Sequence, residues 1–208
     1  GAVYTREEIE EIVSIAIEHD LWIVSDEIYS RLIWNGGEHV SPATIEGGIE
    51  RTIVISGWSK TWAMTGMRVG FLAGPEQAVR AAVKCQANSA SHIPTFMMEA
   101  ARVALDCDDH VERFSDAYRQ RRKLMVQGLE DIPGLRIVNP EGAFYLFIDV
   151  SGTGMSDVEF ADGALEAGVQ LIPASLITGG EGFIRVSYAA SEEDIKEGIS
   201  RLRSWLLQ

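Results

Sequence analysis

The chain has 208 residues, 46% hydrophobic and 24% charged, so it is long enough for one large or two small domains with a buried core. Its 18 basic and 31 acidic residues give a net charge of −13, which argues against nucleic acid or an anionic membrane as a partner. No apolar run is long enough to span a bilayer.

The cysteines and histidines point to no metal site. Cys85 and Cys107 lie far apart and form no C-x-x-C pair, which favours a reducing cytoplasm over a disulfide framework. The four histidines lack the spacing of metal ligands, so we interpret them as ordinary surface or helix residues (His19, His39, His92 and His110). We therefore expect a cytoplasmic protein without a bound metal.

The first part of the chain alternates helical and strand patterns. Thr5 to Glu8 form a capping box, and apolar residues at helical spacing follow to about residue 19, which predicts a helix. Apolar runs at residues 21–24, 52–55 and 69–74 come next, and the first of them predicts a strand that is buried on both faces. A helix that leads into such strands is typical of an α/β sheet.

Polar and reactive side chains follow the first two of these runs. Asp26 and Tyr29 come at or just after the end of the first strand, and Lys60 follows the second. Ligands of α/β sheets bind at the carboxyl ends of the strands. We therefore expect these three residues to contribute to one site.

Lys60 and Arg68 suit a cofactor that carries an aldehyde and a phosphate. An amine that forms an imine must be partly desolvated and close to positive charge, because both favour its neutral, nucleophilic form. An arginine eight positions later can hold a phosphate in a fixed fork geometry. The alternative is a surface pair of cations in a loop, which a lone lysine without the surrounding pattern would favour.

The second part of the chain begins with helical patterns and ends in a mixture. Helices are predicted at 76–87, 95–106 and 109–130, and Pro133-Gly134 makes a turn. Strands are then predicted at 135–138, 143–149, 169–172 and 183–188, with helices at 156–167 and after the capping residue Ser191. Elements that pair locally after the long helix predict a separate α+β domain.

The segment from Ser56 to Gly70 resembles the lysine signature of class I/II aminotransferases, which are pyridoxal-phosphate enzymes of fold type I. Residues 24–29 resemble the D-E-x-Y segment of that family, and residues 182–188 resemble its G-F-I-R-x-S segment. The resemblance implies an α/β fold in two parts. Residues 1–95 would be a remnant of the large cofactor-binding domain with a mixed sheet, and residues 96–208 would be a long connecting helix with a small C-terminal α+β domain.

The resemblance also implies the roles of five residues around the cofactor. Lys60 would form the Schiff base with pyridoxal 5'-phosphate and then act as the base that moves the substrate proton. Asp26 would face the pyridine nitrogen and keep it protonated, and Tyr29 would donate a hydrogen bond to the phenolic oxygen of the ring. Ser59 and Arg68 would hold the phosphate.

Arg185 resembles the arginine that binds the substrate α-carboxylate with two parallel hydrogen bonds. A lone arginine in an alternating strand is more often a surface residue, and only the surrounding pattern favours the functional interpretation. The loop at residues 173–180 lacks the family's P-G-x-x-F-G form, which leaves the substrate undetermined. Gly57 stands where the family often has a hydroxyl residue, and Trp58 is bulkier than usual at its position.

The implied function is amino-group transfer between an amino acid and a 2-oxo acid by a cytoplasmic homodimer, as in aspartate aminotransferases. A β-lyase, or a ring-forming lyase that acts on a methionine derivative, would use the same residues. The ligand-sensing domain of a transcription regulator is a further alternative, and an inert gene fragment is another.

The resemblance covers essentially the whole chain but only the second half of the family's usual length. Gly1 resembles the last residue of the family's N-P-x-G turn, and the chain begins without methionine, as a fragment would. The Gly-rich helix start that cradles the phosphate and the aromatic that stacks on the ring have no counterpart. We therefore expect the chain alone to bind the cofactor weakly and to turn over slowly or not at all.

Overall fold

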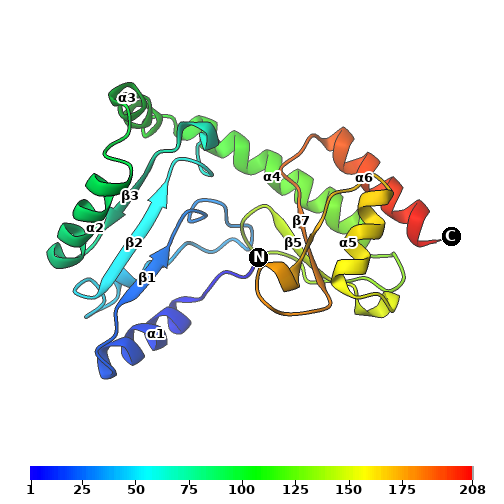
Figure 1. Ribbon diagram of the computed structural model, residues 1–208, viewed down its shortest axis with the longest axis horizontal. Coiled ribbons are helices and arrows are strands. Elements are labelled where there is room, and N and C mark those ends of the chain that lie inside the picture. Colours follow the sequence, from blue (N-terminus) through cyan, green and yellow to red (C-terminus); the bar gives the residue numbers. More distant parts are fainter. Residues whose placement is uncertain (208) are drawn as a thin grey trace. The chain divides into compact units, whose positions relative to one another are not determined.

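The computed structural model describes residues 1–207 as two units (Figure 1). The N-terminal unit comprises Val3–Phe114, and the C-terminal unit comprises Gly1–Ala2 and Ser115–Gln208. The chain passes from one unit to the other within helix α4 (Asp108–Leu129). The division into family domains at residues 95 and 96 stays a prediction.

The N-terminal unit contains a mixed three-stranded sheet in the order β1-β2-β3. Strand β1 (Ile23–Asp26) is parallel to β2 (Thr52–Gly57), and β2 is antiparallel to β3 (Gly70–Ala73). The long connection from β1 to β2 contains a 3-10 turn at Pro42–Thr44. This arrangement confirms the predicted α/β fold with part of a mixed sheet.

Three helices accompany this sheet. Helix α1 (Arg6–Glu18) begins with the predicted capping box, because Thr5 accepts from the Glu8 backbone and the Glu8 carboxylate accepts from the Thr5 backbone. Its buried side chains repeat at helical spacing (Ile9, Val13 and Ala16). Helices α2 (Glu76–Ser89) and α3 (Thr95–Ala104) follow β3, as the sequence predicts.

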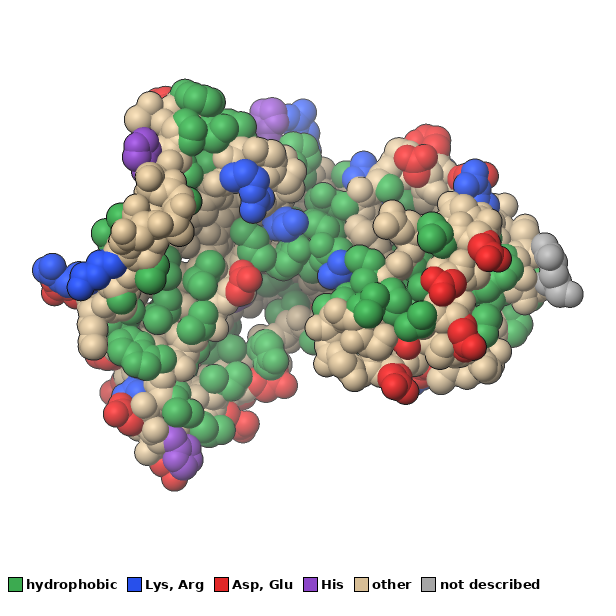
Figure 2. Space-filling view, in the orientation of Figure 1, with side chains coloured by type: hydrophobic (Ala, Val, Ile, Leu, Met, Phe, Trp, Pro, Cys, Tyr) green, Lys and Arg blue, Asp and Glu red, His purple; other side chains and the backbone are tan. Residues whose placement is uncertain are grey.

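One face of the sheet is open, contrary to the prediction that the first strand is buried on both faces. Val24 in β1 is 63% exposed, Ile55 in β2 is 39% exposed and Leu72 in β3 is 36% exposed. The register places these side chains on the same face, and Figure 2 shows hydrophobic side chains at the surface over these strands. The prediction fails because no element of the described N-terminal unit covers this face.

The C-terminal unit contains a four-stranded antiparallel sheet in the order β4-β5-β7-β6. Its strands are β4 (Arg136–Ile137), β5 (Tyr145–Asp149), β6 (Ile172–Pro173) and β7 (Phe183–Ser187). Helices α5 (Asp157–Glu166) and α6 (Glu192–Leu206) lie side by side in Figure 1 and contact each other through Phe160 and Trp205. The predicted α+β domain is confirmed.

The core of this unit lies between the sheet and its helices. Alternate residues of β5 and β7 are buried, as period-2 side chains on a half-covered sheet should be (Leu146, Ile148, Ile184 and Val186). Phe160 of α5 and Leu202 of α6 line the same apolar core. The opposite face carries the partly exposed side chains of Tyr145, Phe147 and Arg185.

Among the helices of residues 1–207, none combines the length and the apolar character that crossing a bilayer requires.

Candidate functional site

The carboxyl ends of β1 and β2 bring two of the predicted site segments together. The strands are parallel neighbours, and Asp26, the last residue of β1, is the register partner of Ile55 in β2. Asp26 is exposed, and its Oδ1 accepts from the Ile28 N–H at 3.1 Å. Its Oδ2 accepts no hydrogen bond within residues 1–207, so that one carboxylate oxygen is available to a ligand.

Lys60 lies in the turn that follows β2. Its Nζ is 6.0 Å from the centre of the Tyr29 ring, a distance at which an ammonium is attracted to the ring face. Both residues are half-buried. The structure therefore brings Lys60 and Tyr29 together, next to the strand that ends at Asp26.

Backbone hydrogen bonds fix the conformation of the turn that carries Lys60. The Trp58 N–H donates to Val69 O at 3.2 Å, and the Trp58 carbonyl accepts from Trp62 and Met64, each at 3.3 Å. The Ala63 N–H donates to Lys60 O at 3.3 Å. The position of Lys60 is thus fixed by a hydrogen bond of its own carbonyl and by the backbone hydrogen bonds of Trp58.

The close approach of β2 and β3 explains why residue 57 is a glycine. A Cβ at this position would lie 2.7 Å from Val69 O and 3.0 Å from Gly70 Cα, distances that backbone atoms cannot accommodate. The hydroxyl that the family often has here is excluded by this approach. Ser59, the other predicted hydroxyl, is half-buried in the turn.

Trp58, bulkier than the family pattern, is accommodated by α3 and by two aromatic rings. Its indole Nε1 donates to Ala101 O at 2.9 Å. Its ring stacks on Trp62 at 5.7 Å between centroids and meets Phe71 edge to face at 5.9 Å. The side chain therefore anchors the Lys60 turn to the body of the unit.

Arg68 precedes β3 in a left-handed backbone conformation, with φ 51° and ψ 43°. Its guanidinium is exposed and donates to Thr65 O at 3.1 Å. Ala63, in the same turn, is also left-handed, with φ 54°. Such conformations are unfavourable for residues with a Cβ, and they cluster where the surrounding structure enforces them.

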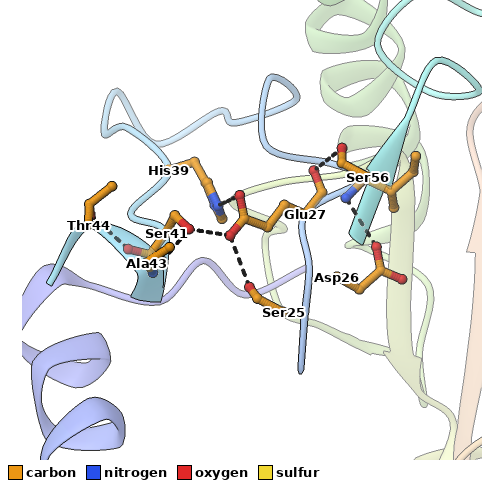
Figure 3. A network of polar contacts seen from close by, with 9 residues as sticks. Ser25, Asp26, Glu27, His39, Ser41, Ala43, Thr44 and Ser56 are labelled. Carbon is orange, nitrogen blue, oxygen red and sulfur yellow. Dashed lines mark hydrogen bonds and ion pairs between the residues drawn. The ribbon is translucent and has the colours of Figure 1, made fainter. Parts of the chain in front are cut away.

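Glu27 is the centre of a polar network beside Asp26 (Figure 3). Its Oε1 accepts from Ser41 Oγ at 2.5 Å and from Ser25 Oγ at 3.1 Å, and its Oε2 lies 3.0 Å from His39 Nε2. Burial raises the pKa of the Glu27 carboxyl, but the hydrogen bonds from His39, Ser41 and Ser25 outweigh this effect and leave the pKa below its usual value. Glu27 is therefore ionised at neutral pH.

The predictions from sequence did not include this network. We interpret His39 from sequence as an ordinary surface residue, and it is exposed, but its Nε2 also lies 3.0 Å from Glu27 Oε2. The sequence Ser25-Asp26-Glu27 does indicate that Glu27 and Asp26 lie on opposite faces of the sheet, since neighbouring side chains of a strand point in opposite directions. The partners in the loop at residues 39–41 could not be paired with Glu27 without the fold.

Arg185 lies in the C-terminal unit, and the other five predicted site residues lie in the N-terminal unit. Its guanidinium carbon is 4.7 Å from the centre of the Tyr145 ring, which lies on the same face of the sheet. Phe147, the register partner of Arg185, stacks on Phe183 at 5.2 Å. Arg185 is half-buried on an aromatic surface. The rings restrict the movement of its guanidinium and leave N–H donors accessible to a ligand.

Two further predicted segments have structural roles in this unit. The buried Tyr188 hydroxyl donates to the carbonyl of Ala143 at 2.9 Å, which joins the end of β7 to the start of the predicted strand at 143–149. The Ser175 N–H, in the loop that departs from the family pattern, donates to Asp157 Oδ2 at 2.8 Å. This bond lowers the pKa of the Asp157 carboxyl and ties the loop to the start of α5.

Comparison with known families gives one match that spans almost the whole chain. The family model described as aminotransferase class I and II matches residues 1–202. An aromatic-amino-acid aminotransferase from Thermococcus litoralis is 41% identical over 99% of this chain and 54% of its own length. An aspartate aminotransferase from Pyrococcus abyssi is 40% identical over 99% of this chain and 54% of its own length.

Solved structures give the same result. The crystal structure of an aromatic aminotransferase from Pyrococcus horikoshii is 39% identical and superimposes with a TM-score of 0.93, covering 98% of this chain and 56% of that one. A Thermus thermophilus aspartate aminotransferase with maleate is 36% identical, with a TM-score of 0.90, covering 98% of this chain and 53% of that one. The chain spans about half the length of the relatives that it matches.

Proposed function

Because this chain belongs to the aminotransferase class I and II family, we propose that it carries the lysine-bearing part of a pyridoxal-phosphate-dependent transaminase site. The reaction would move an amino group from an amino acid to a 2-oxo acid. The observation that carries the proposal is the position of Lys60, in the turn after β2, with its Nζ 6.0 Å from the Tyr29 ring and beside the strand that ends at Asp26.

The residues of the N-terminal unit suit the chemistry of pyridoxal phosphate. The Asp26 oxygen that accepts no hydrogen bond within residues 1–207 can accept from a protonated ring nitrogen. The exposed Arg68 guanidinium has donors beyond the one bonded to Thr65, and these suit a phosphate. Ser59 lies next to Lys60 and can add a hydroxyl donor to the same phosphate.

Pyridoxal phosphate, when bound, supplies an aldehyde that reacts with amines and a ring that withdraws electrons from the bond being broken. In our proposal Lys60 would hold the cofactor through its Nζ. The same amine would act as the base that accepts and returns the proton of the substrate Cα. Tyr29 donates to the phenolic oxygen of the ring, and Asp26 holds the proton on the ring nitrogen.

Arg185 would bind the substrate carboxylate. Its guanidinium can form two parallel hydrogen bonds with a carboxylate, and the Tyr145 ring limits the directions in which it can turn. The Thermus relative was solved with maleate, a dicarboxylate, which supports a substrate with at least one carboxylate for this chain also. Relatives act by name on aspartate or on aromatic amino acids, and the substrate proposed here is the amino acid class as a whole.

We further propose that the protein works as a homodimer in the cytoplasm, as the family resemblance implies. The strongly acidic composition argues against nucleic acid as a partner.

Covalent labelling tests the role of Lys60. The chain has four lysines, Lys60, Lys84, Lys123 and Lys196. After incubation with pyridoxal phosphate and reduction with borohydride, peptide mapping by mass spectrometry should find the label at Lys60. We expect Lys60→Ala to abolish this label and Lys84→Ala to retain it. Equal labelling of all four lysines would contradict the proposal.

Product analysis tests the reaction class. With an amino acid and a 2-oxo acid as substrates, any turnover should give a new amino acid and a new 2-oxo acid in equal amounts. Ammonia with pyruvate from a β-substituted amino acid would instead indicate a β-lyase. Because the chain spans about half the length of its relatives, we expect weak cofactor binding and slow or no turnover from these 208 residues alone. Tight stoichiometric binding would show that this expectation is wrong.

A further inference from the structure

Glu27 is fixed through its backbone to the neighbouring strand. Its N–H donates to Ile55 O at 2.8 Å, which extends the ladder between β1 and β2 by one residue. Its carbonyl accepts from Ser56 Oγ at 3.3 Å. Glu27, which lies between Asp26 and the turn at Tyr29, is therefore hydrogen-bonded to β2 through both its N–H and its carbonyl.

The Glu27 side chain is fixed on the opposite side from Asp26. Figure 3 shows it directed toward His39 and Ser41, while the Asp26 carboxylate points away. The Glu27 side chain is 11% exposed, so its charge depends on the donors that surround it. These donors come from β1 itself and from the loop at residues 39–41 (Ser25, His39 and Ser41).

The donors of the loop are themselves held in place. Ser41 Oγ accepts from the Ala43 N–H at 3.3 Å, and the Thr44 hydroxyl donates to Ser41 O at 2.7 Å. Ser41 thus caps the 3-10 turn at Pro42–Thr44 while it donates to Glu27. The network connects β1, the loop and this turn, and it ends one residue from the Asp26 carboxylate.

We propose that Glu27 is a positioning residue of the cofactor site, which holds the backbone between Asp26 and Tyr29 so that both side chains meet the ring of the cofactor. The inference rests on the proposed function. Asp26 Oδ1 is bonded to the N–H of Ile28, the residue after Glu27, so a shift of the Glu27 backbone moves the donor that orients the Asp26 carboxylate. The loop at residues 39–41 acts through Glu27, and His39 acts as a donor to its carboxylate.

The first test uses no cofactor. Hydrogen exchange of the backbone amides of Glu27 and Ile28 is followed by NMR in the labelled 208-residue chain. Glu27→Gln removes the charge but keeps the size, and it turns one end of the side chain into a donor that faces other donors. We expect exchange of both amides to become about ten-fold faster, because a charge-assisted network is broken.

Two matched controls separate positioning from general stability. Glu38→Gln removes an exposed carboxylate from the same loop, and we expect its amide exchange to match that of the unchanged chain. His39→Gln keeps a side-chain donor, and we expect it to retain exchange within about two-fold, whereas His39→Leu should resemble Glu27→Gln. Uniformly faster exchange across α1 and the sheet in Glu27→Gln would overturn the proposal in favour of general destabilisation.

The second test measures the dissociation constant of pyridoxal phosphate by equilibrium dialysis. We expect it to rise about ten-fold in Glu27→Gln and in His39→Leu, and less than about two-fold in Glu38→Gln and His39→Gln. An unchanged constant in Glu27→Gln overturns the proposal. If the unchanged chain binds no pyridoxal phosphate, the proposed function fails. The hydrogen-exchange data then decide by themselves whether Glu27 positions the backbone next to Asp26. Unchanged exchange at Ile28 would then overturn the positioning role as well.

Discussion

Asp149, the last residue of β5, accepts hydrogen bonds from two separate segments. The Ser151 N–H donates to its Oδ1 at 2.9 Å, and Arg136 Nη2 lies 2.6 Å from its Oδ2. The hydrogen bonds from Ser151, followed by the contact with Arg136, lower the pKa of the Asp149 carboxyl to about 2. The ionised carboxylate therefore links β4, β5 and the turn at Ser151–Thr153.

We expect Asp149→Asn to lower the free energy of unfolding at pH 7 by about 1 kcal/mol, a value reduced for solvent screening. Because the pKa is lower in the folded chain, the stabilisation is complete above the unfolded value of 3.8 and disappears as the pH falls toward about 2. Urea unfolding between pH 7 and pH 2 should show the variant and the unchanged chain converging at the acid end. Asp162→Asn, at an exposed position, is the control and should leave the curve unchanged.

At the residue scale, sequence could locate functional side chains but not the contacts that hold them. Lys60 and Asp26 were assigned from the family pattern, and both were expected at strand ends because parallel strands gather ligands at one edge. The pairing of Glu27 with His39 depends on how a twelve-residue stretch of loop folds back, which no local pattern specifies. The need for glycine at position 57 likewise arises from the approach of Val69, the residue before β3, and of Gly70.

Helices α5 and α6 meet at a glycine. A Cβ added at Gly163 would lie 2.3 Å from Cζ2 of Trp205, whose ring is itself held edge to face against Phe160 at 5.1 Å. The absence of a side chain at Gly163 therefore allows the indole of α6 to lie directly against the backbone of α5. Gly198 in α6 has no heavy atom within 4 Å of the same hypothetical Cβ.

This pair of glycines predicts opposite results for the same substitution. We expect Gly163→Ala to destabilise the chain by about 1 kcal/mol, since overpacking against the indole exceeds the gain in helix propensity. Gly198→Ala should stabilise it by about 0.5–1 kcal/mol through that propensity alone. Thermal unfolding of both variants is the measurement, and equal shifts of the two would contradict the packing argument.

At the element scale, the predicted helices agree with the structure to within one or two residues, whereas several strands start later than predicted, and two of these late starts share one cause. The run at 21–24 was expected to be a strand, but β1 is Ile23–Asp26. Leu21 instead caps the end of α1, because its N–H donates to Ala16 O at 2.8 Å after the left-handed Asp20. An apolar residue that terminates a helix looks the same in sequence as one that begins a strand.

The second late strand has the same cause. The run at 169–172 was expected to be a strand, but β6 is Ile172–Pro173. The Val169 N–H donates to Ala164 O at 2.8 Å, after the left-handed Gly168 ends α5. In both places the first residue of the apolar run donates its N–H to a carbonyl in the last turn of the preceding helix.

At the scale of the whole molecule, the open face of the β1-β2-β3 sheet is an exposed apolar feature of the N-terminal unit. Ile55 and Leu72 are register partners, and Val24, the partner of Ile53, lies on the same face; we call these three exposed residues the stripe. Contiguous apolar surface of this kind binds apolar dyes and promotes association. The alternation of the strands was predictable, but the exposure of one face depends on the other elements present.

We expect the double substitution Val24→Thr with Ile55→Thr to reduce the fluorescence of the dye ANS bound to the chain by about half. Val83→Thr with Val103→Thr removes two exposed valines from helices α2 and α3 and is the control. The control pair should leave most of the fluorescence, because its residues are not part of the stripe. Equal losses in the two double variants would contradict a specific apolar site on the sheet.

The left-handed conformations of Ala63 and Arg68 have a thermodynamic consequence for the N-terminal unit. Each of them costs the folded chain about 1 kcal/mol relative to an ordinary backbone, and both lie in the segment that follows Lys60. In the proposed function, a phosphate would bond to Arg68 in the folded chain only, and its binding would favour the conformation that bears this cost. Ligand concentration and folding are then linked, so that in a cell the fraction of folded molecules would rise with the supply of the phosphorylated ligand.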